Sequence, residues 1–181
     1  MRGVLVALGL AIAGGAMAHP HNYTDQQVQL SVGLASVHIR IFVMPSPKDG
    51  PVIFSHIDTD DDGVVTNAEA KAFGADVLAA TELTVDERGF AFTNVEVTLP
   101  SARAAENGSA AIIVQASTPI SLARQQSHLL QFSITYGALS HSWFIQPFFH
   151  PDLFRTSVPP TVDRATSEAM VVVRFDNLVT E

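Results

Sequence analysis

The segment QVQLSVGLASVHIRIFV, residues 27–43, alternates apolar and polar side chains twice, with a short break in the middle. Alternation with a period of two places successive side chains on opposite faces of a β-strand. The break at residues 33–36 is short enough for a turn, so we predict a hairpin whose two strands share one buried face. The apolar residues expected on that face are Val28, Leu30, Val32, Leu34, Val37, Ile39, Ile41 and Val43, with His38 and Arg40 pointing outward.

The same alternation returns in short runs along the rest of the chain, separated by turn sequences such as DERG, AENGS and YGALS. Many short strands with frequent turns predict a mainly β fold, either an antiparallel β-sandwich or a partly open barrel. Prolines predict a loop-rich return over residues 147–163 to the last strand. The predicted strands are Leu83–Asp86, Phe90–Phe92, Val95–Leu99, Ala111–Ala116, Leu129–Tyr136, Ser142–Gln146 and Ala169–Phe175.

The N-terminal segment has the composition of a leader: Arg2 is followed by an apolar run, and Ala16-Met17-Ala18 has the small-x-small form of a cleavage site. We therefore expect a signal peptide over residues 1–18, cleaved after Ala18, and a single β-rich domain over residues 19–181. The alternative is an uncleaved anchor. The apolar run is short for a bilayer and no second one follows, so we expect a periplasmic or secreted protein that does not span the membrane after processing.

The chain is acidic, with 18 acidic and 10 basic residues among 181, and it contains no cysteine. Several of the acids crowd into residues 58–69, and the remainder of the chain is close to balanced. This distribution argues against nucleic acid and anionic membranes as partners. The absence of cysteine excludes disulfides and thiolate chemistry, and in an exported protein it favours a bacterial periplasm.

Two helical segments interrupt the strand pattern. The alanine-rich stretch NAEAKAFGADVLAA, residues 67–80, has Phe73 and Val77 at helical spacing. The stretch GPVIFSHI, residues 50–57, predicts a helix of about two turns with Pro51 in its first turn. The sequence therefore predicts one helix–loop–helix unit inserted into a β domain.

The loop between these helices reads DTDDDGVVTNAE and carries acids at fixed offsets. With Asp58 at position one, Asp60, Asp62 and Glu69 fall at positions three, five and twelve, and Gly63 falls at position six. This is the pattern D-x-[DN]-x-[DN]-G-x5-E, and the segment 54–80 resembles an EF-hand calcium-binding loop. Val65 at position eight and the apolar residues Phe54, Ile57 and Phe73 on the flanking helices agree with that resemblance.

Calcium explains this spacing because the ion takes six to eight oxygen ligands in a flexible geometry. Gly63 permits the sharp bend, and Thr66 would act directly or through water. The predicted ligands are the side chains of Asp58, Asp60 and Asp62, the backbone carbonyl of Val64 and both carboxylate oxygens of Glu69.

The competing interpretation is an acidic turn that caps a helix and faces water, because Asp and Gly are common turn residues. Repulsion among the carboxylates favours the metal-bound interpretation. No second loop of this kind follows, and the incoming helix is short. These departures favour a structural or modulatory site similar to extracellular calcium modules, which bind at about 10⁻⁴–10⁻³ M.

Histidines support a second hypothesis. Processing after Ala18 would expose His19, and an N-terminal amine with its imidazole can bind copper together with a second histidine such as His21, His128, His141 or His150. The start AHPHNY and the segment HLLQFSITYGALSHSWF are similar to exported domains associated with nickel/cobalt or hydrogenase- and urease-accessory metal permeases. That resemblance implies a periplasmic copper- or nickel-binding accessory domain whose partner is a membrane-transport or other protein. The alternative is that these are ordinary terminal and strand residues.

No nucleophile motif is present: Ser140-His141-Ser142 lacks the form G-x-S-x-G. An aromatic cluster, Trp143, Phe144, Phe148, Phe149 and Phe154, predicts core packing, or a partner surface if it proves exposed. The leading hypothesis is therefore an exported, non-enzymatic protein that binds calcium in an inserted EF-hand.

Overall fold

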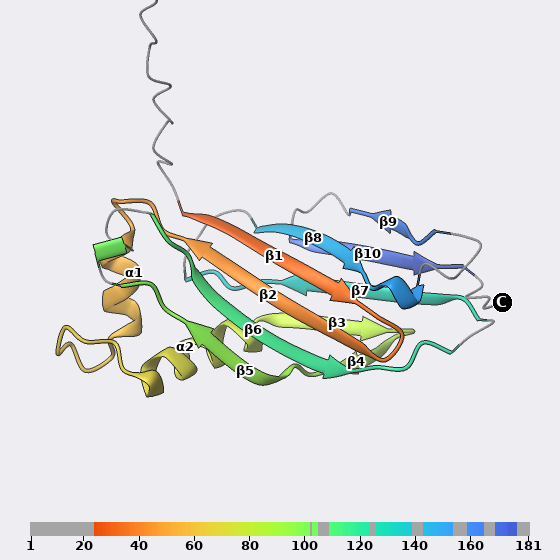
Figure 1. Ribbon diagram of the computed structural model, residues 1–181, viewed down its shortest axis with the longest axis horizontal. Helices are drawn as coiled ribbons and strands as arrows, with labels where there is room; N and C mark the ends of the chain where they lie inside the picture. The colour runs from red at the N-terminus through yellow and green to blue at the C-terminus, as the bar shows by residue number, and fades with distance from the viewer. Residues whose placement is uncertain are drawn as a thin grey trace, which may run out of the picture.

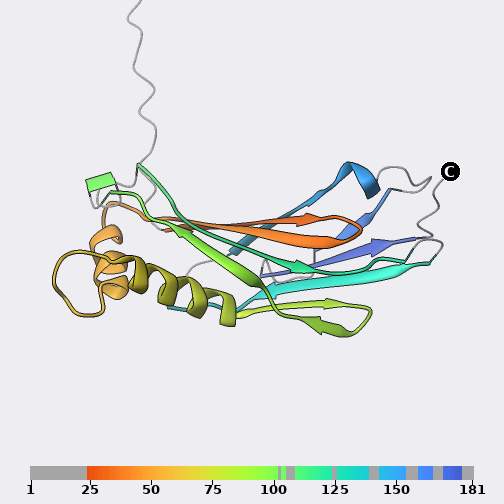
Figure 2. The same ribbon diagram turned by 60° about the horizontal axis from the view of Figure 1, so that its bottom comes forward.

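The computed structural model describes residues 24–101, 103–104, 109–123, 126–138, 143–153, 159–164 and 169–176. Its strands form two five-stranded sheets that face each other as a sandwich (Figures 1 and 2). Two helices lie together at one end of the sandwich, and the β1–β2 turn lies at the opposite end (Figure 1). The mainly β, sandwich-like architecture is therefore confirmed, and the described strands do not close into a barrel.

The first sheet has the strand order β5-β6-β2-β1-β8. Its centre is the predicted hairpin, in which Val28 pairs with Ile41 and Val32 pairs with Val37. The edge strand β8 runs parallel to β1, so the expectation of a wholly antiparallel sandwich was wrong for this pair. A parallel neighbour needs a long connection, and here most of the chain lies between β1 and β8. The strands are β1 Asp25–Val32, β2 Ser36–Met44, β5 Thr93–Thr98, β6 Ile112–Pro119 and β8 Trp143–Phe149.

The second sheet has the order β4-β3-β7-β10-β9 and is antiparallel throughout. A two-residue turn joins β3 to β4, and both of its residues, Asp86 and Glu87, have positive φ, of 50° and 66°. Two such residues match the right-handed twist of the flanking strands. The strands are β3 Thr81–Val85, β4 Arg88–Phe90, β7 His128–Ile134, β9 Thr161–Asp163 and β10 Met170–Phe175.

The apolar core fills the space between the two sheets. Every predicted inward residue of the β1–β2 hairpin is buried except Leu34, which lies in the turn and is partly buried. His38 and Arg40 point outward as expected. From the second sheet, Leu130, Phe132 and Val173 close the core with no exposed surface. Period-two alternation predicted these faces because only one side of each sheet meets another layer.

Most of the predicted strand bounds differ from the structure by one to three residues, and two differences in the C-terminal part change the predicted elements. β8 continues through Pro147 to Phe149, so the loop predicted from residue 147 begins later. An edge strand tolerates proline because one side of its backbone has no ladder partner. The short strand β9 was not predicted, since three residues carry too little alternation to be recognised. Between them lies the 3₁₀ helix η1, Pro151–Leu153.

Helices α1, Gly50–Ile57, and α2, Asn67–Ala79, occupy the predicted positions. α1 buries Ile53 and Ile57 in the core, and α2 buries Phe73 and Val77. α2 packs against the edge strand β5, and Figure 2 shows the helix alongside that sheet. This contact holds the loop between the two helices at the end of the sandwich.

The predicted signal peptide, residues 1–18, lies outside the described residues, and so does Phe154. Among the helices that the structure does describe, none combines the length and the apolar character needed to cross a membrane. The aromatic cluster divides between core and surface: Trp143 is buried and Phe149 packs edge-on against Phe175, whereas Phe144 and Phe148 are exposed on β8.

Candidate cation site

The ends of the two helices position the site. α1 ends at Ile57, and the N–H of Asp58 still donates to the carbonyl of Phe54 at 2.8 Å. α2 begins at Asn67, with Thr66 as its N-cap. Thr66 and Glu69 form a reciprocal capping box, which satisfies backbone donors that the first helical turn leaves unpaired. Asp58 and Glu69 therefore sit on well-defined helix ends, with a nine-residue connection from 58 to 66 between those helices.

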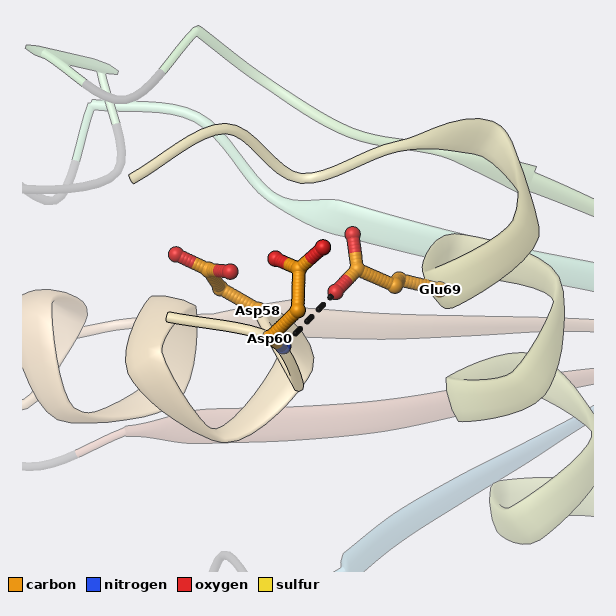
Figure 3. Close-up of side chains that lie close together, drawn as sticks. All are labelled: Asp58, Asp60 and Glu69. Atoms are coloured by element: carbon orange, nitrogen blue, oxygen red, sulfur yellow. Dashed lines mark hydrogen bonds between the residues drawn. The ribbon is translucent and has the colours of Figure 1, made fainter. Parts of the chain in front are cut away.

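Three carboxylates converge where the helix ends meet. One oxygen each from Asp58, Asp60 and Glu69 lies within 4.8 Å of the others, and within the described ranges this is the only such group of three His, Asp or Glu side chains. Figure 3 shows the three carboxylates side by side, with Asp60 between Asp58 and Glu69; Asp58 and Asp60 come from the start of the loop and Glu69 from α2. Asp58 and Glu69 are each 9% exposed, while Asp60 is open to solvent.

Hydrogen bonds within the loop fix its curvature. Asp58 Oδ2 accepts from the N–H of Gly63 at 2.8 Å, and Asp58 Oδ1 accepts from the N–H of Asp62 at 3.3 Å. The backbone turns back through positive φ at Asp61, 57°, and at Gly63, 82°. The loop thus wraps around the Asp58 carboxylate, and Gly63 adopts a conformation that other residues enter only with strain.

Glu69 links the start of the loop to its end. Its Oε1 accepts from the N–H of Thr59 at 2.7 Å, and its Oε2 accepts from the N–H of Thr66 at 2.8 Å. The backbone and hydroxyl of Thr66 contribute most to lowering the pKa of Glu69, Thr59 adds to this, and burial opposes it; the pKa of Glu69 falls from 4.5 to about 2. Glu69 is therefore ionised across the physiological range of pH.

Asp60 has the opposite perturbation. Partial desolvation by the surrounding loop raises the pKa of Asp60, the negative charges of Asp62 and Glu69 raise it further, and the N–H of Asp62 only partly offsets them. Carboxylates held close together repel each other, and this repulsion raises the pKa of a carboxyl group among them. Such a cluster is stabilised by any cation that enters it.

The structure brings together three of the predicted side-chain ligands and leaves one apart. Asp62 is outside the close group, and its Oδ1 accepts from the N–H of Val64 at 2.8 Å. The side chain of Val64 is 63% exposed, as expected of a residue assigned a role through its backbone carbonyl alone. The roles of Asp62 and Val64 as ligands remain predictions.

The donor set is chemically suited to a hard cation. It consists of carboxylate oxygens, which Ca²⁺ and Mg²⁺ prefer, and the three residues contribute neither nitrogen nor sulfur ligands. An ionised carboxylate has about four lone-pair sites. The N–H and hydroxyl groups of Thr59 and Thr66 make four hydrogen bonds to the Glu69 carboxylate, so Glu69 must give up some of these bonds when it contacts an ion.

The histidines proposed as transition-metal ligands have different settings. His19, His21 and His141 lie outside the described residues. His128 is buried, with Nδ1 2.6 Å from Asp86 Oδ2 and Nε2 2.9 Å from the carbonyl oxygen of Ala123. Both of its nitrogens are engaged, which leaves no nitrogen for a metal. The ring of His150 lies beside the ring of His38. The sequence predicted only that His38 faces outward.

Comparison of the chain with protein-family models, with curated proteins and with solved structures found no match in any of the three.

Proposed function

We propose that this protein is an exported, non-enzymatic calcium-binding protein whose loop from Asp58 to Glu69 holds one Ca²⁺ in the manner of an EF-hand. The observation that carries the proposal is the convergence of Asp58, Asp60 and Glu69 oxygens within 4.8 Å at the junction of two helices. The leader-like N-terminal segment supports export, and the absence of cysteine favours a bacterial periplasm among exported locations.

The ligand assignment follows from the positions of the oxygens. Asp58 and Asp60 supply oxygens from the start of the loop, and Glu69 supplies one or both oxygens from the first turn of α2. A modest rotation of the exposed Asp62 side chain adds a fourth carboxylate, and the Val64 carbonyl and water complete the six to eight oxygens that Ca²⁺ takes. Mg²⁺ is the less suitable ion because it demands near-ideal octahedral geometry.

The proposed effect of the ion is to stabilise the helix–loop–helix unit. Ca²⁺ would offset the repulsion of Asp60 by Asp62 and Glu69 and would join the end of α1 to the start of α2. Because α2 packs on β5, ordering of the loop would stabilise this end of the sandwich. A ligand at a hundred times its Kd stabilises the folded state by about 2.7 kcal/mol.

The test is calorimetric titration of the full chain with Ca²⁺, together with melting curves in Ca²⁺ and in a calcium chelator. We expect one Ca²⁺ site per chain and a higher Tm in Ca²⁺ than in chelator. Asp58→Ala and Glu69→Gln should each lose the Ca²⁺ site and this difference in Tm. Asp61→Asn is a matched control, because it removes one charge from the same loop at a residue outside the close group. Asparagine tolerates the positive φ of position 61. Equal melting curves in Ca²⁺ and chelator would refute the proposal. If Asp61→Asn weakened Ca²⁺ binding as much as Asp58→Ala and Glu69→Gln do, the effect of Ca²⁺ would be non-specific screening of charge.

A further inference from the structure

A second cluster of titratable side chains lies on the first sheet, at the opposite end from the helices. His38 is on β2 and pairs with Ser31 of β1, which in turn pairs with Phe148 of β8. His150 follows β8 by one residue, and its N–H donates to the carbonyl of Val32 at 2.9 Å. The β1–β2 turn and the chain after β8 are neighbours in both views (Figures 1 and 2).

The pairing of the strands brings the two imidazoles to the same outer face. The rings of His38 and His150 are nearly parallel, at 13°, with their centroids 6.0 Å apart. Metal–nitrogen bonds of about 2.0–2.1 Å place the centroids of two imidazoles on one ion roughly 5–6.5 Å apart, depending on the angle at the metal. The observed separation of 6.0 Å lies in this range, but the rings are stacked, so their nitrogens can face a single ion only after one ring turns.

Gly33 in the β1–β2 turn provides the space for this arrangement. A Cβ at position 33 would lie 3.2 Å from His150 Nδ1 and 3.5 Å from Asp152 Oδ2. A nitrogen of the imidazole and an oxygen of the carboxylate thus border the space that a side chain at position 33 would enter, and they lie close to each other there.

Asp152 supplies an oxygen that lacks a partner. η1 holds this residue next to His150, through a hydrogen bond from the N–H of Leu153 to the His150 carbonyl at 3.0 Å. Asp152 Oδ2 accepts from the N–H of Leu34 at 3.1 Å, whereas Oδ1 is buried and has no hydrogen-bond partner among the described residues. Buried polar atoms are nearly always paired, so an unpaired carboxylate oxygen indicates a missing donor or cation.

We propose that His38, His150 and Asp152 form a site for a divalent transition-metal ion of the zinc, nickel or copper type. The two imidazoles are direct ligands, Asp152 Oδ1 is the third, and water completes the coordination. A depression of about 330 Å³, lined by His38, Arg40, Glu96 and Ser117 among others, gives water access to His38. The nitrogen and carboxylate donors suit these borderline metals better than Ca²⁺.

Binding requires one side-chain movement. The three residues do not reach the 4.8 Å convergence of the acidic group, and His38 Nε2 is 3.1 Å from Ser36 Oγ. The His38 side chain is exposed, so its ring can rotate toward His150 without disturbing the core. This site is independent of the calcium proposal, because it uses different residues at the other end of the sandwich.

The test is a zinc titration of the full chain, purified without a histidine tag, against a chromophoric zinc indicator. His19 and His21 are replaced by alanine in every sample, which removes the N-terminal imidazoles. We expect His38→Gln and His150→Gln each to weaken zinc binding at least about tenfold, and Asp152→Asn to weaken it as well, with no change in His56→Gln. His56 is a matched control because it is an exposed histidine at the helical end of the molecule.

Equal zinc affinity in the parent, His38→Gln and His150→Gln chains would overturn the proposal. Loss of binding in Glu69→Gln instead would assign the zinc to the acidic loop and would also overturn it. If His150→Gln fails to fold, the NMR signals of the imidazoles in the parent decide the question. Zinc-induced shifts of both His38 and His150 support the site, and unchanged signals refute it.

Discussion

Thr59 and Glu69 are joined across the loop: the N–H and the hydroxyl of Thr59 both donate to Glu69 Oε1, at 2.7 and 3.0 Å. Glu69 simultaneously caps α2 through Thr66. One carboxylate therefore closes the loop at both ends, before any cation is considered. Substitution of Glu69 consequently has two effects, on the fold of the loop and on its affinity for an ion, and experiments must separate them.

Charge and coordination can be distinguished by comparing two neighbouring aspartates. Asp60→Ala and Asp61→Asn each remove one negative charge, but only Asp60→Ala also removes a ligand oxygen of the converging group. We expect Asp60→Ala to weaken Ca²⁺ binding at least tenfold, and Asp61→Asn to change it by less than about threefold, because exposed charges interact weakly in water. Calorimetric Kd values at fixed ionic strength provide the measurement. Similar losses in the two variants would contradict site-specific coordination by Asp60.

The depressed pKa of Glu69 predicts how cation-free protein responds to acid. Because the folded pKa is about 2 and the ordinary value is 4.5, the ionised carboxylate contributes stability that is complete above pH 4.5 and is lost as the pH falls toward 2. In chelator, the difference in unfolding free energy between the parent and Glu69→Gln should shrink over that interval. Denaturant unfolding at several pH values measures it, with Glu82→Gln as an exposed control. A constant difference from pH 6 to pH 2.5 would contradict the role assigned to this carboxylate.

His128 and Asp86 predict a second acid-sensitive contact. Asp86 and the Ala123 carbonyl both accept hydrogen bonds, so His128 satisfies both only as an imidazolium. Burial raises the pKa of Asp86, but the hydrogen bond from His128, the N–H of Leu129 and the charge of His128 outweigh it and the pKa is lowered overall. The contribution of Asp86 is therefore present above pH 3.8 and is lost as the pH falls through its lowered value.

We expect Asp86→Asn to lower the unfolding free energy at pH 7 by about 1 kcal/mol, since a charge-assisted hydrogen bond is lost at a half-exposed position. Asparagine tolerates the positive φ of Asp86, which limits the change to the side-chain contact. Glu87→Gln, at the next position of the same turn, serves as the control. Denaturation at pH 7 and pH 3 should show the effect of Asp86→Asn diminishing in acid.

Gly74 predicts how tightly α2 is packed. A Cβ at this position would lie 2.5 Å from Val97 Cγ2 and 3.2 Å from Val95 Cγ1, both on β5. Gly74→Ala gains about 1 kcal/mol in helix propensity, but overpacking costs about 1–3 kcal/mol, so we expect net destabilisation of about 1 kcal/mol. The double variant Gly74→Ala/Val97→Ala should recover part of the loss, as a double-mutant cycle would show. A Cβ at Gly89 would meet no atom within 4 Å. The unfolding free energy of Gly89→Ala should therefore stay within about 0.5 kcal/mol of that of the parent.

Local patterns predicted much of this molecule. The alternation of residues 27–43 predicted β1, β2 and their buried face, and the alanine-rich stretch predicted α2 to within one residue at its C-terminal end. The loop spacing predicted that the side chains of four acids would converge, and the structure brings Asp58, Asp60 and Glu69 together but leaves Asp62 outside the group. These features are local because they depend on periods of 2 and 3.6 residues and on a loop of fixed length.

The sequence alone determined most of the strands, helices α1 and α2 and the set of carboxylates, because each of these follows from neighbours a few residues apart. Only the tertiary structure decided that β8 lies parallel beside β1, that His128 meets Asp86, and that His38, His150 and Asp152 share one surface. Those contacts join residues separated by tens of positions or more. Their formation depends on how two sheets pack and which strands become neighbours, and no periodicity within a single segment encodes that choice.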